Sequence, residues 1–237
     1  MRIPINCKEC GLSGKARPAV FIEFRDDGRY EFTCEDGHKT VTILQQQRFE
    51  ILFDIGAYAI LDGYYRDAVA SFASSLERFY EFFILASFLE DDLDYQVFHK
   101  TWTNVSSQSE RQLGAFIFIY LKSFSSPPPL LKSSNFRNKV IHQGKIPSRE
   151  EAINFGNEVL SIIRPTMELV KNKFPRGVEK SVIQHITGCR KPDDQHNIAT
   201  LHVPMILNLM YCDSPEKSLE DALVDKQLYQ RWQKSGL

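Results

Sequence analysis

The chain has 237 residues, of which 43% are hydrophobic and 12% aromatic, and its formal net charge at pH 7 is −1. This length fits one large domain or a main domain with a small module, and it allows a sizeable core. A charge so close to neutral excludes a protein that coats DNA or RNA along its length. It leaves room for a nuclease that touches its substrate briefly through a local basic field.

The sequence carries no targeting or membrane signal that we can identify. The first residues lack the apolar segment of a secretory signal peptide. The most apolar runs, 82–89 and 113–121, are far shorter than the ~20 residues needed to span a bilayer. The number of cysteines is odd, five in all, which argues against a disulfide framework. We therefore expect a cytoplasmic protein with reduced thiols and no membrane partner.

Residues 1–45 have the pattern of a small β module. Residues 20–24 and 30–33 are rich in aromatic and β-branched side chains, and Asp26-Asp27-Gly28 between them is a turn signal. This pattern predicts a β-hairpin between the two segments. Residues 39–43 are expected to form a third strand.

The same module contains a candidate metal site. Cys7 and Cys10 form a Cys-x2-Cys pair, and Cys34 and His38 follow with Cys-x3-His spacing. Three thiolates and one imidazole make the closed tetrahedral set of a structural zinc site. A module of this size buries little core, so zinc is expected to supply much of its folding free energy. The alternative is a chance set of reduced cysteines.

Other cysteines and histidines do not form an equally convincing set. They are His185, Cys189, His196, His202 and Cys212. We interpret them as free thiols and surface histidines rather than as a second metal site.

From residue 46 onward the apolar period becomes helical. Helices are predicted over about 45–62, 65–89, 109–124, 133–142 and 148–174, the second of them central because residues 82–85 are apolar all round. Gly144 is placed to end the fourth helix. Ser148 and Glu151 have the spacing of a capping box. The predicted fold is therefore mainly α, with a helical bundle over 46–174. Residues 175–237 form a C-terminal extension of unknown role that ends in a short helix over 218–232.

The most informative stretch lies in the fourth predicted helix and contains Arg137, Asn138 and His142. From Arg111 to Arg149 there is no Asp or Glu, yet there are seven Lys or Arg. Such a field suits a phosphodiester. An imidazole can take the proton of a ribose 2′-hydroxyl or protonate the leaving 5′-oxygen, and a guanidinium can stabilise the charge on the phosphorane.

Asn138 is placed to orient the phosphate or the imidazole. Such chemistry leaves a 2′,3′-cyclic phosphate and a 5′-hydroxyl and needs no catalytic metal. The spacing itself is common, and the alternative is that Arg137 and His142 only cap a helix. Arg190 and His196 have a similar spacing, but Pro192 lies between them and breaks any helix. This pair is therefore not a catalytic candidate and can serve as a control.

The Arg137-Asn138-x-x-x-His142 motif, set in an all-helical pattern, resembles the Arg-x4–6-His motif of the HEPN superfamily (higher eukaryotes and prokaryotes nucleotide-binding domain). The resemblance covers roughly residues 46–174. It implies a helical bundle that forms a homodimer and brings two motifs into one cleft. Members of the family often act as toxins or antiphage effectors that cleave tRNA or mRNA.

In the family an acidic or polar residue on an earlier helix often supports the arginine, and Glu77 is the matching candidate here. One departure concerns regulation. Family toxins that a nucleotidyltransferase antitoxin silences carry a tyrosine two residues after the histidine, and this chain has Gly144 there. Control by tyrosine nucleotidylation is therefore in doubt.

Two functions stay open at this point. The first is a metal-independent endoribonuclease with a zinc-ribbon-like accessory module, with RNA as substrate and an antitoxin or regulatory protein as a further partner. The second is a catalytically inactive HEPN scaffold or sensor that binds nucleic acid or protein through the zinc ribbon. A zinc-ribbon transcription regulator is disfavoured by the net charge of −1.

Overall fold

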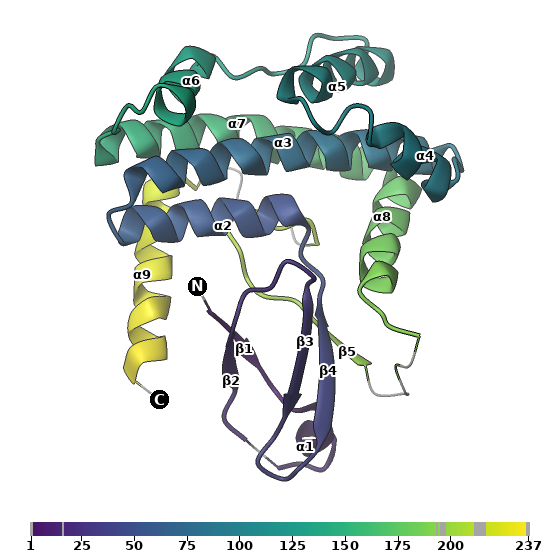
Figure 1. Ribbon diagram of the computed structural model, residues 1–237, viewed down its shortest axis with the longest axis vertical. Helices are drawn as coiled ribbons and strands as arrows, with labels where there is room; N and C mark the ends of the chain where they lie inside the picture. The colour runs from purple at the N-terminus through teal and green to yellow at the C-terminus, as the bar shows by residue number, and fades with distance from the viewer. Residues whose placement is uncertain (1, 16, 193, 195–197, 211–216, 236–237) are drawn as a thin grey trace. The chain divides into compact units, whose positions relative to one another are not determined.

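The structure is a computed structural model that describes residues 2–15, 17–192, 194, 198–210 and 217–235, with side chains as far as residue 227. It is mainly helical, with 59% of residues in helices and a small antiparallel hairpin near the N-terminus, which confirms the predicted fold class. The strands are β1 (Arg2–Ile5), β2 (Val20–Glu23), β3 (Arg29–Thr33), β4 (Lys39–Leu44) and β5 (Ile198–Leu201). The helices are α1 (Lys8–Leu12), α2 (Arg48–Leu61), α3 (Tyr65–Glu90), α4 (Tyr95–Trp102), α5 (Ser109–Phe124), α6 (Ser134–His142), α7 (Arg149–Lys173), α8 (Pro175–Gly188) and α9 (Leu219–Ser235) (Figure 1).

The chain divides into two compact units. One comprises 1–47 and 182–204, and the other comprises 48–181 and 205–237. The predicted C-terminal extension 175–237 is therefore shared between the two units. The reason is that β5 pairs in parallel with β4, with Val41 beside Ile198 and Leu44 beside Leu201. A short strand so distant in sequence carries no local signal of its partner.

The N-terminal strands differ from prediction in their pairing. β2 pairs with β1, and β3 pairs with β4, so the expected hairpin across Asp26-Asp27-Gly28 does not form. Asp27 accepts hydrogen bonds from the side chain of Arg25 and from the backbone of Arg29, and this turn links two different sheets. The observed hairpin is β3–β4, whose connecting loop contains Cys34 and His38. β1 escaped prediction because it is four residues long and contains a proline.

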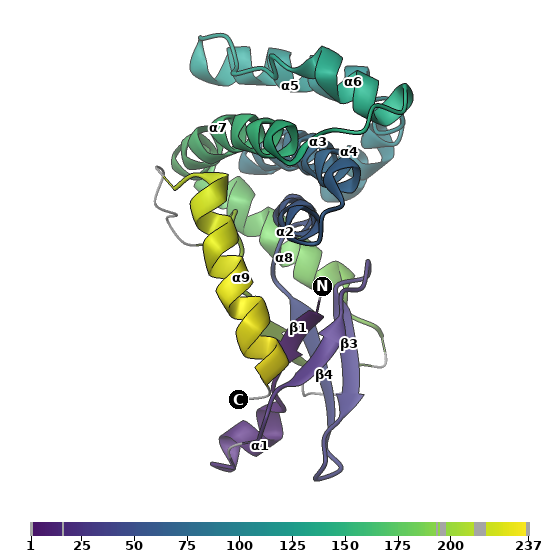
Figure 2. The same ribbon diagram turned by 90° about the vertical axis from the view of Figure 1, so that its left-hand side faces the viewer.

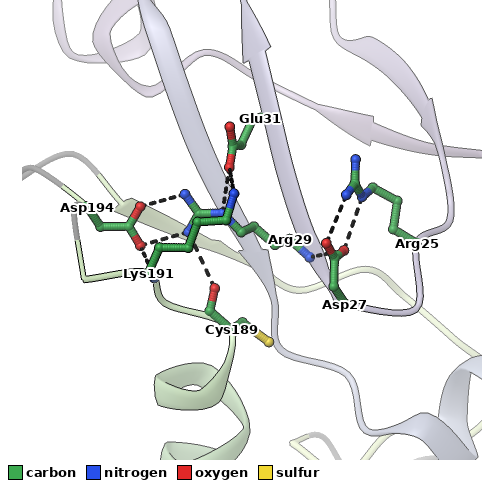
Figure 3. Close-up of polar contacts among 7 residues, drawn as sticks. All are labelled: Arg25, Asp27, Arg29, Glu31, Cys189, Lys191 and Asp194. Atoms are coloured by element: carbon green, nitrogen blue, oxygen red, sulfur yellow. Dashed lines mark hydrogen bonds and ion pairs between the residues drawn. The ribbon is translucent and has the colours of Figure 1, made fainter.

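A buried ion pair joins Asp194, which lies shortly before β5 in the sequence, to Arg29 of β3 (Figure 3). The Arg29 guanidinium donates to both carboxylate oxygens of Asp194, at 2.7 and 2.5 Å, and to the Cys189 carbonyl at 3.3 Å. Glu31 bridges Arg29 and Lys191 at 2.7 and 2.9 Å. The Arg29 hydrogen bond holds the pKa of Asp194 below its usual value. Charged groups this deeply buried require such pairing.

In the helical unit, α3 is the central element. It packs against α2, α4, α5, α6 and α7. In both views α2 lies on one side of the layer formed by α3 and α7, and α5 and α6 lie on the other side (Figures 1 and 2). The predicted central position of residues 82–85 agrees with this packing, because Phe82, Phe83 and Ile84 are all at most 4% exposed.

Aromatic rings fill both sides of α3. Phe49 of α2 lies 5.3 Å from the rings of Phe79 and Phe82. On the opposite side Phe83 packs edge-on against Phe116 of α5 at 5.0 Å. The apolar residues 82–84 are thus buried inside the fold, whereas Phe88 of the same helix is 38% exposed.

Several predicted helix ends are confirmed. α5 spans the residues predicted for it, the capping box of Ser148 and Glu151 is formed, and Gly144 adopts the left-handed conformation at φ +75°. α4 was not predicted, although Asp94 caps it by accepting hydrogen bonds from the backbones of Gln96 and Val97. A single aspartate before a short apolar pattern is too weak a signal to predict a helix from the sequence.

Two buried carboxylates on α2 hold the C-terminal segment. Asp54 is fully buried, accepts the Ile206 backbone N–H at 2.9 Å and forms an ion pair with Lys226. Glu50 accepts the Leu209 N–H at 2.8 Å. Burial raises the pKa of Asp54, which Lys226 opposes. These carboxylates give residues 205–210 and the start of α9 a structural role that the sequence did not reveal.

Among the described residues, no helix combines the length and the hydropathy that a bilayer crossing needs.

The close approach of α8 to α3 generates a stability prediction. A Cβ on Gly177 would lie 1.9 Å from the Ala86 carbonyl oxygen, whereas a Cβ on Gly114, also helical, would meet nothing within 4 Å. Gly177→Ala should lower the free energy of unfolding by about 2 kcal/mol or more, because backbone must move. Gly114→Ala should be neutral or raise it by up to ~1 kcal/mol. Urea unfolding checks both, and equal behaviour of the two variants would contradict the packing of α8.

Candidate functional site

The four predicted zinc ligands come together in the N-terminal part of the chain. Cys7 and Cys10 lie at the start and in the middle of α1, and Cys34 and His38 flank the turn between β3 and β4. The turn is closed by hydrogen bonds from the Cys34 N–H to the His38 carbonyl at 3.1 Å and from the Gly37 N–H to the Cys34 carbonyl at 2.9 Å. Gly37 has φ +83°, which a residue with a side chain rarely adopts.

The geometry of the four ligand atoms fits a zinc ion. With Zn–S bonds of about 2.3 Å and Zn–N bonds of about 2.0 Å, neighbouring ligands of a tetrahedral site lie roughly 3.5–3.8 Å apart. The His38 Nδ1 lies 3.8 Å from Cys7 Sγ, 3.4 Å from Cys10 Sγ and 3.5 Å from Cys34 Sγ. The sulfurs of Cys10 and Cys34 are 3.8 Å apart. The site therefore matches the predicted Cys3His set.

The surroundings shift the pKa values of two of the sulfurs in opposite directions. Burial opposes ionisation of Cys7, but hydrogen bonds from Thr40 and from the Cys10 backbone lower its pKa to about 6. Burial and the adjacent thiols raise the pKa of Cys10 to about 12. A metal that binds all three sulfurs must displace the remaining protons, so its affinity falls at low pH.

An acidic group next to the site is neutralised by an arginine. Asp36 lies 3.4 Å from Cys10 Sγ and accepts two hydrogen bonds from Arg17, at 2.7 and 3.2 Å. Zinc with three thiolates carries a net negative charge, so Arg17 offsets repulsion between this site and Asp36. Neither Asp36 nor Thr40 was identified from the sequence.

The other cysteines and histidines form no second cluster in the part of the chain that the structure describes. His185 Nε2 lies 2.9 Å from the Leu44 carbonyl oxygen, and His202 Nδ1 lies 2.9 Å from the Gln46 side-chain nitrogen. Burial lowers the pKa of His202. His196 and Cys212 lie outside the described residues.

The metal site makes a direct prediction. Purified protein should contain about one zinc per chain. Cys34→Ser should lose the metal and unfold the N-terminal module while most of the helical circular dichroism remains, because the helical unit contains none of the ligands. Cys189→Ser, a half-buried cysteine of the same unit outside the site, is the matched control and should keep its zinc. Wild-type protein that is folded and metal-free would disprove the assignment.

The Arg137 side chain is held by the residue that the resemblance selected. Its guanidinium donates to Glu77 Oε1 of α3 at 2.6 Å and to Asn138 Oδ1 at 3.0 Å. The side chains of Arg137 and Glu77 are 19% and 27% exposed. A partly desolvated, charge-assisted pair of this kind orients the guanidinium more firmly than a surface pair does.

The helix that carries the motif is fixed from two sides. Val140 is fully buried, and Phe136 packs on Phe155 of α7 with ring centroids 5.8 Å apart. The carboxylate of Glu158 in α7 accepts hydrogen bonds from the backbones of Lys132 and Ser133, which satisfies donors at the start of α6. Glu158 thus replaces a side-chain cap from the helix itself, and the sequence did not indicate it.

Asn138 and His142 lie on the exposed side of α6. Both are two residues from the buried Val140 and therefore point away from it. In the described part of the chain no hydrogen bond orients the His142 ring. The backbone carbonyl of Ile141, next to it, accepts a hydrogen bond of 3.5 Å from Arg66 of α3. Arg66 is a second cation at this end of α6 that the motif did not reveal.

The stretch without acidic residues is less basic in three dimensions than in sequence. Acidic residues of α3 and α7 pair with it: Glu77 with Arg137, and Glu151 with Lys145 at 2.5 Å. Lys132, Lys139 and Arg149 remain exposed. The charge around α6 is therefore positive, but the acidic residues of α3 and α7 neutralise part of it.

No family model matches this chain, and no curated protein or solved structure is similar to it. The resemblance to the HEPN superfamily therefore rests on the motif and on the helical pattern around it.

Proposed function

We propose that the protein is a metal-independent endoribonuclease of the HEPN type with a structural zinc site in its N-terminal unit. The observation that carries the proposal is the contact between Glu77 and Arg137, with Asn138 and the exposed His142 on the same short helix. A guanidinium held by a carboxylate and an imidazole open to solvent can serve transesterification of RNA, the first by stabilising charge and the second by acid-base catalysis.

The proposed reaction uses the ribose 2′-hydroxyl as nucleophile. The 2′-oxygen attacks the phosphorus and the bond to the 5′-oxygen breaks. His142 accepts the hydroxyl proton or protonates the leaving 5′-oxygen, and the His142 of a second copy carries out the other transfer. Arg137, held by Glu77, stabilises the negative charge that develops on the phosphorane oxygens. Asn138 hydrogen-bonds Arg137 and is exposed beside the position of the phosphate. The zinc site has a closed ligand set and stabilises the fold without entering the reaction.

A homodimer completes the proposal. The imidazole of an acid-base residue is normally oriented by a further group, and within the described residues His142 has none. A second copy of the chain would supply the partner motif, as the family resemblance implies. The cellular role that follows is a cytoplasmic toxin or antiphage effector that cleaves tRNA or mRNA and is restrained by an antitoxin or another regulatory protein.

The same observation about His142 favours one alternative. A HEPN bundle whose histidine is not oriented acts as a scaffold or sensor, with the zinc ribbon binding nucleic acid or protein. Cleavage assays separate the two functions.

Substitution of the motif residues tests the catalytic assignment. His142→Ala and Arg137→Ala should each lower RNA cleavage, and any toxicity in cells, by at least ~100-fold while the protein stays folded. Products should end in a 2′,3′-cyclic phosphate, and excess EDTA should spare the activity of zinc-loaded protein.

Two histidines serve as controls for this experiment. His99→Ala, an exposed histidine of α4, and the decoy His196→Ala should leave cleavage unchanged. Full cleavage activity of His142→Ala, or a requirement of cleavage for magnesium, would contradict the ribonuclease assignment. The scaffold function would then be the better explanation.

The Glu77–Arg137 contact makes a separate prediction. Glu77→Gln removes the charge that holds the guanidinium and should lower the cleavage rate about 10-fold. The double variant Glu77→Gln/Arg137→Ala should be no slower than Arg137→Ala alone, because Glu77 acts through Arg137. Glu81→Gln, on the same helix but paired with Arg78, is the matched control. Additive losses in the double variant would mean that Glu77 has a role independent of Arg137.

A further inference from the structure

We propose that the outer face of α5 is a subsite for single-stranded RNA, in which the ring of Phe118 stacks on a base and Arg111 and Lys122 contact flanking phosphates. The proposal rests on the ribonuclease function and places the part of the substrate that lies beyond the scissile phosphate.

Phe118 faces solvent on a helix whose neighbouring aromatic residues, Phe116 and Tyr120, are buried. It is 72% exposed, whereas Phe116 and Tyr120, two residues away on either side, are 0% and 6% exposed. Phe116 stacks on Tyr80 of α3 with ring centroids 4.3 Å apart. Since successive helical residues are rotated by about 100°, Phe118 points away from α3. One exposed apolar residue is unremarkable by itself, so its neighbours decide its meaning.

The neighbours of Phe118 on the same stripe are cations. Arg111 lies seven residues before it and Lys122 four residues after it, and both are exposed. These spacings place all three on one side of the helix over about 16 Å. Gly114, also on this stripe, has open space around it, which leaves room for a base beside the ring. Aromatic rings flanked by cations are typical of surfaces that bind single strands, because every base has a face that can stack.

Both cations are available to an anionic ligand. One arm of the Arg111 guanidinium donates to the Asn104 carbonyl at 3.0 Å, which positions the side chain. Within the residues that the structure describes, neither Arg111 nor Lys122 forms an ion pair with a carboxylate. Apart from Glu110, α5 contains no acidic residue.

The start of α5 lies close to the proposed catalytic arginine. Adjacent residues of α3 reach both helices: Glu77 pairs with Arg137 of α6, and Arg78 donates to Gln112 of α5 at 2.9 Å. α5 and α6 also lie on the same side of α3 in both views (Figures 1 and 2). An RNA strand whose scissile phosphate lies at His142 and Arg137 can therefore continue past Arg111 to Phe118.

Charge favours RNA over a second copy of the chain on this face. A two-fold pairing through α5 would bring the Lys122 end of one helix against the Arg111 end of the other if the helices ran antiparallel, and each cation against its own copy if they ran parallel. Like charges would then meet at both ends of the contact. A polyanion complements both ends at once.

The experiment measures binding without cleavage. Fluorescence anisotropy is recorded with a 2′-O-methylated RNA of about twelve nucleotides, which lacks the nucleophilic hydroxyl. Phe118→Ala and Phe118→Leu should weaken RNA binding roughly 5- to 150-fold, which corresponds to the free energy of stacking one base. Phe118→Tyr should bind as the wild-type protein does, because the ring that stacks is kept. Arg111→Ala and Lys122→Ala should each reduce the slope of log affinity against log salt by about 0.7. Val97→Ala, a 55% exposed apolar residue of α4, is the control and should change neither quantity.

The outcomes separate this subsite from the catalytic proposal. Phe118-dependent binding without cleavage of unmodified RNA would support the subsite and reject the ribonuclease. Motif-dependent cleavage with unchanged affinity and KM in Phe118→Ala would reject the subsite alone. Full RNA affinity of Phe118→Leu would overturn the inference. A Phe118→Ala variant that changes only its oligomeric state in light scattering would overturn it too, because the face would then be a self-association surface. No binding of the modified RNA by wild-type protein would overturn it as well.

Discussion

The burial of α3 on several sides is the constraint on which the helical unit depends. Its aromatic residues face α2 on one side and α5 on the other, and α6 and α7 complete the packing. Because the helix is held this firmly, the few polar side chains it presents have fixed positions. Glu77 and Arg78 are two of these, and each connects a different outer helix to the centre. The proposed site therefore takes its geometry from the core rather than from loops.

The two candidate sites differ in how their residues reach one another. The four candidate metal ligands are brought together by a short helix and one turn, so sequence spacing alone was sufficient to predict that they cluster. The Arg137 site combines two helices, and the motif revealed only one of them. Glu77 came from a resemblance, and its contact with Arg137 is present in the structure, while its role in catalysis stays a prediction. The contacts of Arg66 and Glu158 could not be predicted from the sequence. A charged residue on a helix is usually solvated, and nothing in the local sequence indicates its tertiary partner.

The same distinction explains what could be predicted of the fold. Helices α2, α3, α5, α6 and α7 have strong local periodicity, and their predicted ranges agree closely with the structure. The positions of β2, β3 and β4 were predicted well, but β1 and β5 were missed and the pairing was wrong, because pairing is decided by distant segments. β2 joins β1 rather than β3, and β4 gains β5 from more than 150 residues away. The apolar run at 82–85 shows the opposite case, because its all-round apolar pattern predicted a central position and Phe82, Phe83 and Ile84 are buried.

The parallel pairing of β4 with β5 has a consequence for biosynthesis. The first 47 residues leave the ribosome before any other part of the chain, yet their sheet is completed only when residues 198–201 have been made. Domains usually fold in the order in which they emerge. Before β5 is made, the N-terminal unit lacks one strand and the partner of Arg29, and the helical unit lacks residues 205–237, part of which packs on α2. A nascent chain that stops before β5 would carry the motif helix in a helical unit that is itself incomplete, so neither unit can mature until the residues that follow α8 have been made.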